Sequence, residues 1–250
     1  MGMTSPDPTR AGPRLDAILL DLFGTLIPNG DRASRVRSLA EMAEVLGVDP
    51  ARFPERWLDY FVERTLGSLG TLEETIAHIA ASVGGHPSDE QIRAAGEIRL
   101  EFTRRLLAAC GPSLAPLDSL RAAGFRLVLV SNTSEETVRL WADFPLASRM
   151  DATVFSCSEH LAKPDPRIYR VALDRLRLDA TQCAFVGDGG SHELSGAERV
   201  GLRAFFFAFP DQPDGSAFRI DSDEDWPGET LESLDQLLRF RPGRGEVRPG

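Results

Sequence analysis

The chain has 250 residues, of which 42% are hydrophobic and 26% are charged, and these proportions are typical of a folded globular protein. A formal net charge of −10 argues against a nucleic-acid partner, because phosphates are bound by clustered lysines and arginines. No stretch approaches the roughly 18 apolar residues that a membrane span requires, so no membrane partner is expected. The three cysteines are widely spaced and form no CxxC pair, which indicates reduced thiols in a cytoplasmic protein.

Residues 1–14 are rich in Pro, Gly, Ser and Thr and are expected to form a disordered tail, as are residues 241–250. The first predicted strand is the apolar run at residues 18–20, which leads directly into Asp21. Ligands bind outside the carboxyl ends of strands in an open parallel sheet, so Asp21 stands where chemistry is usually placed. Taken alone, this stretch is equally compatible with a turn-forming role for Asp21.

A helical pattern extends from residue 30 to residue 110, without any predicted strand. Helices are expected at residues 34–46, 54–66, 71–83 and 88–109. The third of these opens with the capping box Thr71-x-x-Glu74. Residues 30–110 are therefore interpreted as a helical cap domain inserted between the first strand and the rest of the sheet.

Strands and helices alternate from residue 111 to residue 240. Strands are expected at residues 125–131, 154–156, 183–188 and 203–209, and helices at residues 117–123, 135–142, 166–176, 194–200 and 230–238. Such alternation predicts right-handed βαβ units and an α/β fold with a doubly wound parallel sheet. Residues 15–29 and 111–240 would together form this core.

Four polar residues recur at the carboxyl ends of the predicted strands or in the loops that follow them. They are Asp21, Ser131, Lys163 and Asp188. Each has an ordinary explanation on its own, as a helix cap, a surface lysine or a turn residue. Together they supply a nucleophilic carboxylate, a hydroxyl donor, a cation and a second carboxylate. Phosphoryl transfer through an aspartyl-phosphate requires this set of groups.

Four segments resemble the motifs of the haloacid dehalogenase-like hydrolase superfamily, in the order of that family and with roughly its spacing. They are Asp21-Leu-Phe-Gly-Thr25, Ser131-Asn132, Lys163-Pro164-Asp165-Pro166-x-Ile168-Tyr169, and Val186-Gly187-Asp188-x-x-x-x-Glu193-x-x-Gly196-Ala197. The resemblance covers about residues 15–240. It implies a Rossmann-like core, with residues 30–110 as the helical cap of phosphoglycolate-phosphatase-like and 2-haloacid-dehalogenase-like members.

The resemblance also implies a role for each matching residue. Asp21 would be the nucleophile, Ser131 would donate to the transferred group, and Lys163 would neutralise the developing charge. Substrate-binding positions would be Gly24, Thr25 and Asn132, and the ligands of a Mg²⁺ ion would be Asp21, the Phe23 carbonyl, Asp188 and Glu193. Glu193 replaces the more usual aspartate of the family, and it would either bind the metal or only steady Lys163.

Phe23 departs from the family pattern, because phosphatases of the family carry a second aspartate there as general acid and base. Loss of such a group typically costs on the order of 10²–10⁴ in rate. The sequence leaves three readings open. The first is a Mg²⁺-dependent phosphatase whose leaving group needs little protonation or is protonated by another acid such as His192. The others are a 2-haloacid dehalogenase-like enzyme, whose halide leaves without a proton, and a non-catalytic binding or regulatory protein.

Asp188 favours the first reading, because a phosphate dianion facing Asp21 needs a divalent cation whereas dehalogenation needs none. The expected partner is a small phosphorylated metabolite, and the protein would be a monomer or homodimer. One helical face of the cap carries Trp57, Tyr60, Phe61 and Arg64, and it is interpreted mainly as cap core with an arginine reaching to solvent. The alternative is that Arg64 or Tyr60 faces the substrate. Three further arginines, Arg32, Arg35 and Arg37, lie just beyond the loop of the first motif, where they could meet an anionic substrate, but a solvated helix start is the favoured interpretation.

Overall fold

The computed structural model describes residues 14–210, 226–240 and 242. A six-stranded sheet lies at its centre, with strand order β3-β2-β1-β4-β5-β6 and parallel pairing throughout. The strands are β1 (Ala17–Leu20), β2 (Arg126–Ser131), β3 (Ala152–Phe155), β4 (Cys183–Gly187), β5 (Arg203–Phe206) and β6 (Glu229–Thr230). The predicted disordered tails fall outside the described residues, except for Arg14 and Pro242.

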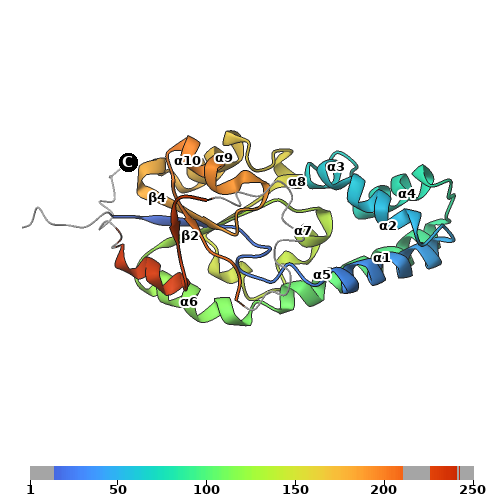
Figure 1. The fold of residues 1–250 in the computed structure, drawn as a ribbon, viewed down its shortest axis with the longest axis horizontal. Helices are drawn as coiled ribbons and strands as arrows, with labels where there is room; N and C mark the ends of the chain where they lie inside the picture. Colours follow the sequence, from blue (N-terminus) through green and yellow to red (C-terminus); the bar gives the residue numbers. More distant parts are fainter. Residues whose placement is uncertain (1–13, 211–225, 241, 243–250) are drawn as a thin grey trace, which may run out of the picture.

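Helices cover both faces of the sheet, which is the α/β architecture expected from the alternation (Figure 1). They are α6 (Gly111–Ala122), α7 (Glu135–Trp141), α8 (Ser156–Glu159), α9 (Pro166–Leu176) and α10 (Glu193–Val200), with short 3₁₀ turns at Ala147–Arg149, Ala180–Gln182 and Gly190–His192. Successive residues of β1 alternate between the two faces. Ala17 and Leu19 pack with α9 and α10, whereas Ile18 and Leu20 pack into the larger apolar cluster on the α6 side.

Five further helices follow β1 and extend to one side of the sheet (Figure 1). They are α1 (Arg32–Leu46), α2 (Arg52–Asp59), α3 (Phe61–Thr65), α4 (Leu72–Ser82) and α5 (Asp89–Ala108). The predicted capping box at Thr71 is present, and Ser88 caps α5 through a second capping box. This helical segment occupies the interval interpreted from the sequence as a cap.

Two helix predictions were wrong. The single helix predicted at residues 54–66 is divided into α2 and α3 at Tyr60, whose ψ of 22° interrupts the helical backbone. The helix predicted at residues 230–238 is replaced by strand β6 and a 3₁₀ helix, η5 (Leu234–Arg239). The buried leucines there, Leu231, Leu234 and Leu237, recur every third residue, which is the period of a 3₁₀ helix rather than an α-helix.

The three cysteines are free and buried, in agreement with their interpretation as packing residues. Burial raises the pKa of the Cys157 thiol to about 11 and that of Cys183 to about 12, so neither has the character of a nucleophilic thiolate. Within the described residues, no helix has both the length and the apolar character needed to cross a bilayer.

Candidate active site

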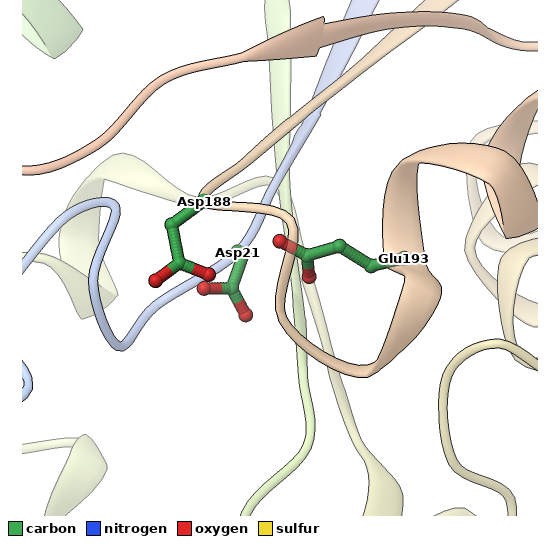
Figure 2. A group of neighbouring side chains, drawn as sticks. All are labelled: Asp21, Asp188 and Glu193. Atoms are coloured by element: carbon green, nitrogen blue, oxygen red, sulfur yellow. The ribbon is translucent and has the colours of Figure 1, made fainter. Parts of the chain in front are cut away.

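Three buried carboxylates meet at the carboxyl edge of the sheet (Figure 2). Asp21 follows β1, Asp188 follows β4, and Glu193 is the first residue of α10. Because β1 and β4 are paired in parallel, with Leu20 opposite Val186, Asp21 and Asp188 both emerge at the carboxyl ends of neighbouring strands. Carboxylate oxygens of the three groups lie within 4.8 Å of one another, although each residue is at most 5% exposed.

Lys163 lies between two of these carboxylates. Its Nζ donates to Asp21 Oδ1 and to Glu193 Oε2, each at 2.5 Å, and the residue is 4% exposed. Lys163 is also the only lysine in the sequence, in which all other basic side chains apart from histidine are arginines. A compact ammonium with three rotatable donors can bridge two carboxylates at one point, whereas a planar guanidinium would need more room.

The buried site carries more acidic groups than its one lysine can balance. Burial raises the pKa of the Asp21 carboxyl, and Asp188 adds to the rise while Lys163 opposes it. Burial and the neighbouring Asp21 raise the pKa of Glu193 well above its ordinary value. Burial alone would lower the pKa of Lys163, but Asp21 and Glu193 outweigh this effect and raise it, so the ammonium stays charged. A further cation at this point would relieve the repulsion.

The oxygen atoms at the site suit a hard divalent cation such as Mg²⁺, which prefers carboxylate and carbonyl ligands. Asp21 and Asp188 supply adjacent carboxylate oxygens. Among the described residues, no backbone hydrogen bond is donated to the Phe23 carbonyl, so that oxygen is free to serve as a ligand. Glu193 accepts hydrogen bonds on both oxygens, from Lys163 and from the Gly189 N–H at 3.1 Å. Glu193 thus contacts Lys163 directly. Its other predicted role, as a ligand of the metal, stays a prediction.

Ser131 and Asn132, at the end of β2, differ in what their side chains contact. The Ser131 hydroxyl is fully buried and has no hydrogen-bond partner within the described part of the chain, which leaves it available to a ligand oxygen. The Asn132 side chain instead binds the backbone of Lys163, accepting from its N–H at 2.8 Å and donating to its carbonyl at 3.1 Å. Asn132 thus positions Lys163, and its predicted contact with substrate stays untested.

The loop after β1 brings three more groups to the carboxylates. Thr25 Oγ1 donates to Asp21 Oδ2 at 3.2 Å, which fixes the orientation of that carboxylate. Gly24 has a φ of +84°, and a Cβ atom there would overlap with the Asp188 carboxylate and lie 2.7 Å from Asn29 Nδ2. Glycine is therefore required by both conformation and space. The substrate contacts predicted for Gly24 and Thr25 are not tested by this geometry.

The position of the missing general acid is occupied by a side chain that cannot transfer protons. The Phe23 ring is partly buried and packs against the larger apolar cluster. His192, the substitute considered from the sequence, is exposed and has left-handed backbone angles just before α10. Its role as an acid stays a prediction.

Sequence reasoning missed Asn29 and misjudged Arg64. Asn29 Nδ2 donates to Asp188 Oδ2 at 3.3 Å, but in the sequence Asn29 is indistinguishable from an ordinary turn residue. Arg64 was expected to reach solvent, yet it is 7% exposed and stacks 4.7 Å from the centroid of the Trp57 ring. Arg64 Nη1 also donates to Ser134 Oγ at 3.2 Å, so it joins the helical segment to the β2–α7 loop. Arg32 and Arg37 are exposed as expected, whereas Arg35 is partly buried.

The family model described as haloacid dehalogenase-like hydrolase matches residues 15–201. The chain is 27% identical over 193 residues to (S)-2-haloacid dehalogenase 4A of Burkholderia cepacia, covering 75% of this chain and 80% of that relative. It is 28% identical over 194 residues to pyrophosphatase PpaX of Bacillus velezensis, covering 76% and 82%. A magnesium complex of the HAD family enzyme bt-2542 from Bacteroides thetaiotaomicron has a TM-score of 0.61 at 21% identity, covering 82% and 98%.

Gly24→Ala is expected to destabilise the protein more than Gly84→Ala. Both glycines have positive φ, where an L-residue costs about 1–2 kcal/mol, but only the Gly24 Cβ would overlap with the active-site carboxylate, since a Cβ at Gly84 meets no atom within 4 Å. The free energies of unfolding in urea give the comparison. Equal losses for the two variants would show that the space around Gly24 is not restricted.

Lys163→Met is expected to make stability fall more steeply as pH rises from 5 to 7.5. Because the pKa values of Asp21 and Glu193 are raised in the folded state, that state binds more protons than the unfolded chain. The contribution of Asp21 and Glu193 to the free energy of unfolding is therefore fully present below the ordinary carboxyl pKa and is lost as pH rises. Removal of the Lys163 ammonium raises both pKa values further and so enlarges this loss. Urea unfolding at each pH measures it, with Arg93→Met on the exposed surface of α5 as the control. A pH slope equal to that of the unmodified protein would contradict the charge assignment.

Proposed function

We propose that this chain, which belongs to the haloacid dehalogenase-like hydrolase family, is a Mg²⁺-dependent phosphatase acting on a small phosphorylated metabolite. The family model spans most of the chain, which confirms the resemblance carried by the four motifs, and the parallel sheet agrees with the expected Rossmann-like core. The relatives include both a dehalogenase and a pyrophosphatase, so the choice of reaction rests on the site itself.

One observation supports phosphate chemistry above the alternatives: three buried carboxylates cluster around a single lysine, which pairs with only two of them. A metal-free dehalogenase site would present this excess of negative charge to the carboxylate of its substrate, and the repulsion would oppose binding. In a phosphatase a bound Mg²⁺ ion would supply two positive charges that offset this excess. Asp21, Asp188 and the Phe23 carbonyl would hold this ion.

In the first step, an Asp21 carboxylate oxygen attacks the phosphorus atom and the bond from phosphorus to the leaving oxygen breaks. The leaving oxygen keeps the electron pair of that bond, and the phosphoryl group becomes an aspartyl-phosphate. Lys163 Nζ, 2.5 Å from Asp21 Oδ1, offsets charge on the nucleophile and on the transferred group. The unpartnered Ser131 hydroxyl would donate to a phosphoryl oxygen.

In the second step, water attacks phosphorus, the bond between Asp21 and phosphorus breaks, and inorganic phosphate leaves. Neither step has a general acid or base at position 23, since Phe23 can neither give nor take a proton. The leaving oxygen must therefore depart with little protonation or take its proton from solvent. This predicts rates that depend strongly on the acidity of the leaving group.

The dehalogenase reading keeps specific support from Phe23 and from the relatedness to (S)-2-haloacid dehalogenase 4A. A halide leaves without a proton, so an aromatic residue at this position costs that reaction nothing. The helical segment α1–α5 would act as a cap in either reaction, covering the carboxylates and excluding water.

Phosphate release from p-nitrophenyl phosphate in MgCl₂ tests the proposal, because its aryl oxide leaves without an acid. Turnover is expected to stop in EDTA and to fall by about 10³-fold or more in Asp21→Asn. The matched assay is chloride release from (S)-2-chloropropionate with EDTA present. Chloride release without phosphate release would replace the phosphatase proposal with the dehalogenase reading, and no turnover in both assays would favour the non-catalytic one.

Phe23→Asp is expected to raise the hydrolysis of alkyl phosphates by about 10-fold or more while changing aryl phosphate hydrolysis little, because only the alkoxide needs a proton. Phe23→Asn is the matched control, because asparagine has nearly the same shape as aspartate but no acidic proton. Values of kcat for ethyl phosphate and p-nitrophenyl phosphate give the ratio, and melting temperatures check folding. An equal gain in both substrates, or a gain in the Asn variant, would show that the acid is not what the site lacks.

A further inference from the structure

A second buried charged group lies between the helical segment and the core, and the mechanism above does not use it. It consists of Arg35, Arg64, Arg99 and Glu136 and is called the arginine cluster below. Arg99, on α5, donates from Nε to Glu136 Oε1 at 2.8 Å, with its Nη2 at 2.7 Å from the same oxygen. Arg64 on α3 donates to Ser134, which in turn donates to Glu136 Oε1 at 3.0 Å.

The arginine cluster has more positive charge than its glutamate can neutralise. Arg64 and Arg99 are each 7% exposed and Glu136 is 2% exposed. Burial, together with the neighbouring arginines, lowers the pKa of Arg64 to about 9 and that of Arg35 to about 10. Burial alone would raise the pKa of Glu136, but Arg99 and Arg64 hold it below its ordinary value. The carboxylate is thus ionised, and the cluster keeps an excess of positive charge.

The guanidinium group of Arg99 still has an unused donor. Arg99 Nη1 is buried and has no hydrogen-bond partner within the described residues. Aromatic rings pack against both guanidinium groups. The Arg99 guanidinium lies 5.3 Å from the ring centroids of Trp57 and Phe102, and the Arg64 guanidinium lies 4.7 Å from the ring centroid of Trp57. A buried donor fixed in this way without an acceptor is costly unless a ligand supplies one.

The arginine cluster also contacts both loops that form the edge of the candidate active site. Arg64 reaches Ser134, three residues after the unpartnered Ser131. Arg35 Nη2 donates to the Asn29 carbonyl at 2.8 Å, and the side chain of Asn29 donates to Asp188. The cluster is therefore connected to Asp188 through Asn29 and to the loop after Ser131 through Ser134, on the side of the helical segment, where the far end of a bound substrate would extend.

We propose that the arginine cluster binds a second oxyanionic group of the substrate, a carboxylate or a phosphate, at the end remote from the transferred phosphoryl group. This rests on the proposed phosphatase function, since it places the first phosphate at Asp21. Guanidinium groups match the paired oxygens of carboxylate and phosphate, and an anion there would accept from Arg99 Nη1 and offset the excess charge. The substrate class is then a phosphorylated acid or a bisphosphate.

A purely structural role is the competing explanation, because the Arg99–Glu136 pair also joins α5 to α7. The two explanations differ in one measurable respect. A structural pair affects the folding and binding of every ligand alike, whereas an anion site affects only ligands that carry the second charge. Binding of non-hydrolysable phosphonates separates these cases without depending on turnover.

Calorimetric titration in MgCl₂ would compare three phosphonates whose far group is the same number of bonds from phosphorus. Propylphosphonate ends in a neutral methyl group, 3-phosphonopropionate ends in a carboxylate, and ethane-1,2-bisphosphonate ends in a second phosphonate. Homologues one methylene longer allow for a longer site. The charged-tail ligands are expected to bind at least tenfold more tightly than propylphosphonate. The larger gain, with carboxylate or with phosphonate, identifies the oxyanion that the cluster prefers.

Arg99→Gln is expected to weaken the charged-tail ligands far more than propylphosphonate, so that the ratio falls towards one, and Arg99→Lys is expected to keep part of the ratio. Arg93→Gln removes the same charge from the exposed surface of α5 and should keep the full ratio. Equal binding of neutral and charged tails, or equal loss for both in a folded Arg99 variant, would overturn the proposal and leave the phosphatase function standing.

Succinate, a dianion without phosphorus, separates failure of this proposal from failure of the proposed function. If propylphosphonate does not bind but succinate binds and needs Arg99, the cluster is an anion site and the phosphatase proposal is wrong. If neither succinate nor any of the phosphonates binds, both proposals are overturned.

Discussion

The ammonium of Lys163 holds the candidate active site together, because it is the protein's own counter-charge to three buried carboxylates. Its two contacts, with Asp21 and Glu193, bring together residues from β1 and α10 that lie far apart in the chain. Two neighbours support this arrangement through hydrogen bonds to the backbone. Asn132 holds the backbone of Lys163, and the Tyr169 hydroxyl donates to the Glu193 carbonyl at 2.8 Å. The site is thus organised around a charge balance that its residues meet only in part, and this shortfall is what makes a metal ion and a phosphate suitable occupants.

A second imbalance of opposite sign lies nearby, in the arginine cluster. The carboxylates favour a cation and the arginines favour an anion, and the loop residue Asn29 contacts both groups, through Asp188 and Arg35. A substrate with a phosphoryl group at one end and an oxyanion at the other would be oriented by both fields at once. Neither group needs to be strong by itself for the pair to determine which end of a substrate reaches Asp21.

The sheet and the position of Asp21 at its carboxyl edge could be predicted from local sequence signals, whereas the arginine cluster could not. Apolar runs that end in aspartate marked β1 and β4, and a proline in the first turn marked α9, because burial and helix starts leave local patterns. Arg64 and Arg99 carry no such pattern, since their burial depends on how the helical segment packs against α7. Tyr60 and the leucines of η5 show the same limit, because a break in a helix or a change to 3₁₀ geometry is decided by packing at the ends of the element.

The single lysine gives the molecule a built-in spectroscopic reporter. All other basic side chains apart from histidine are arginines, so lysine labelled with ¹⁵N at Nζ would yield one side-chain ammonium resonance, already assigned by composition. That nitrogen touches the candidate nucleophile, and its chemical shift would follow each event there, from proton uptake to the formation of a covalent adduct.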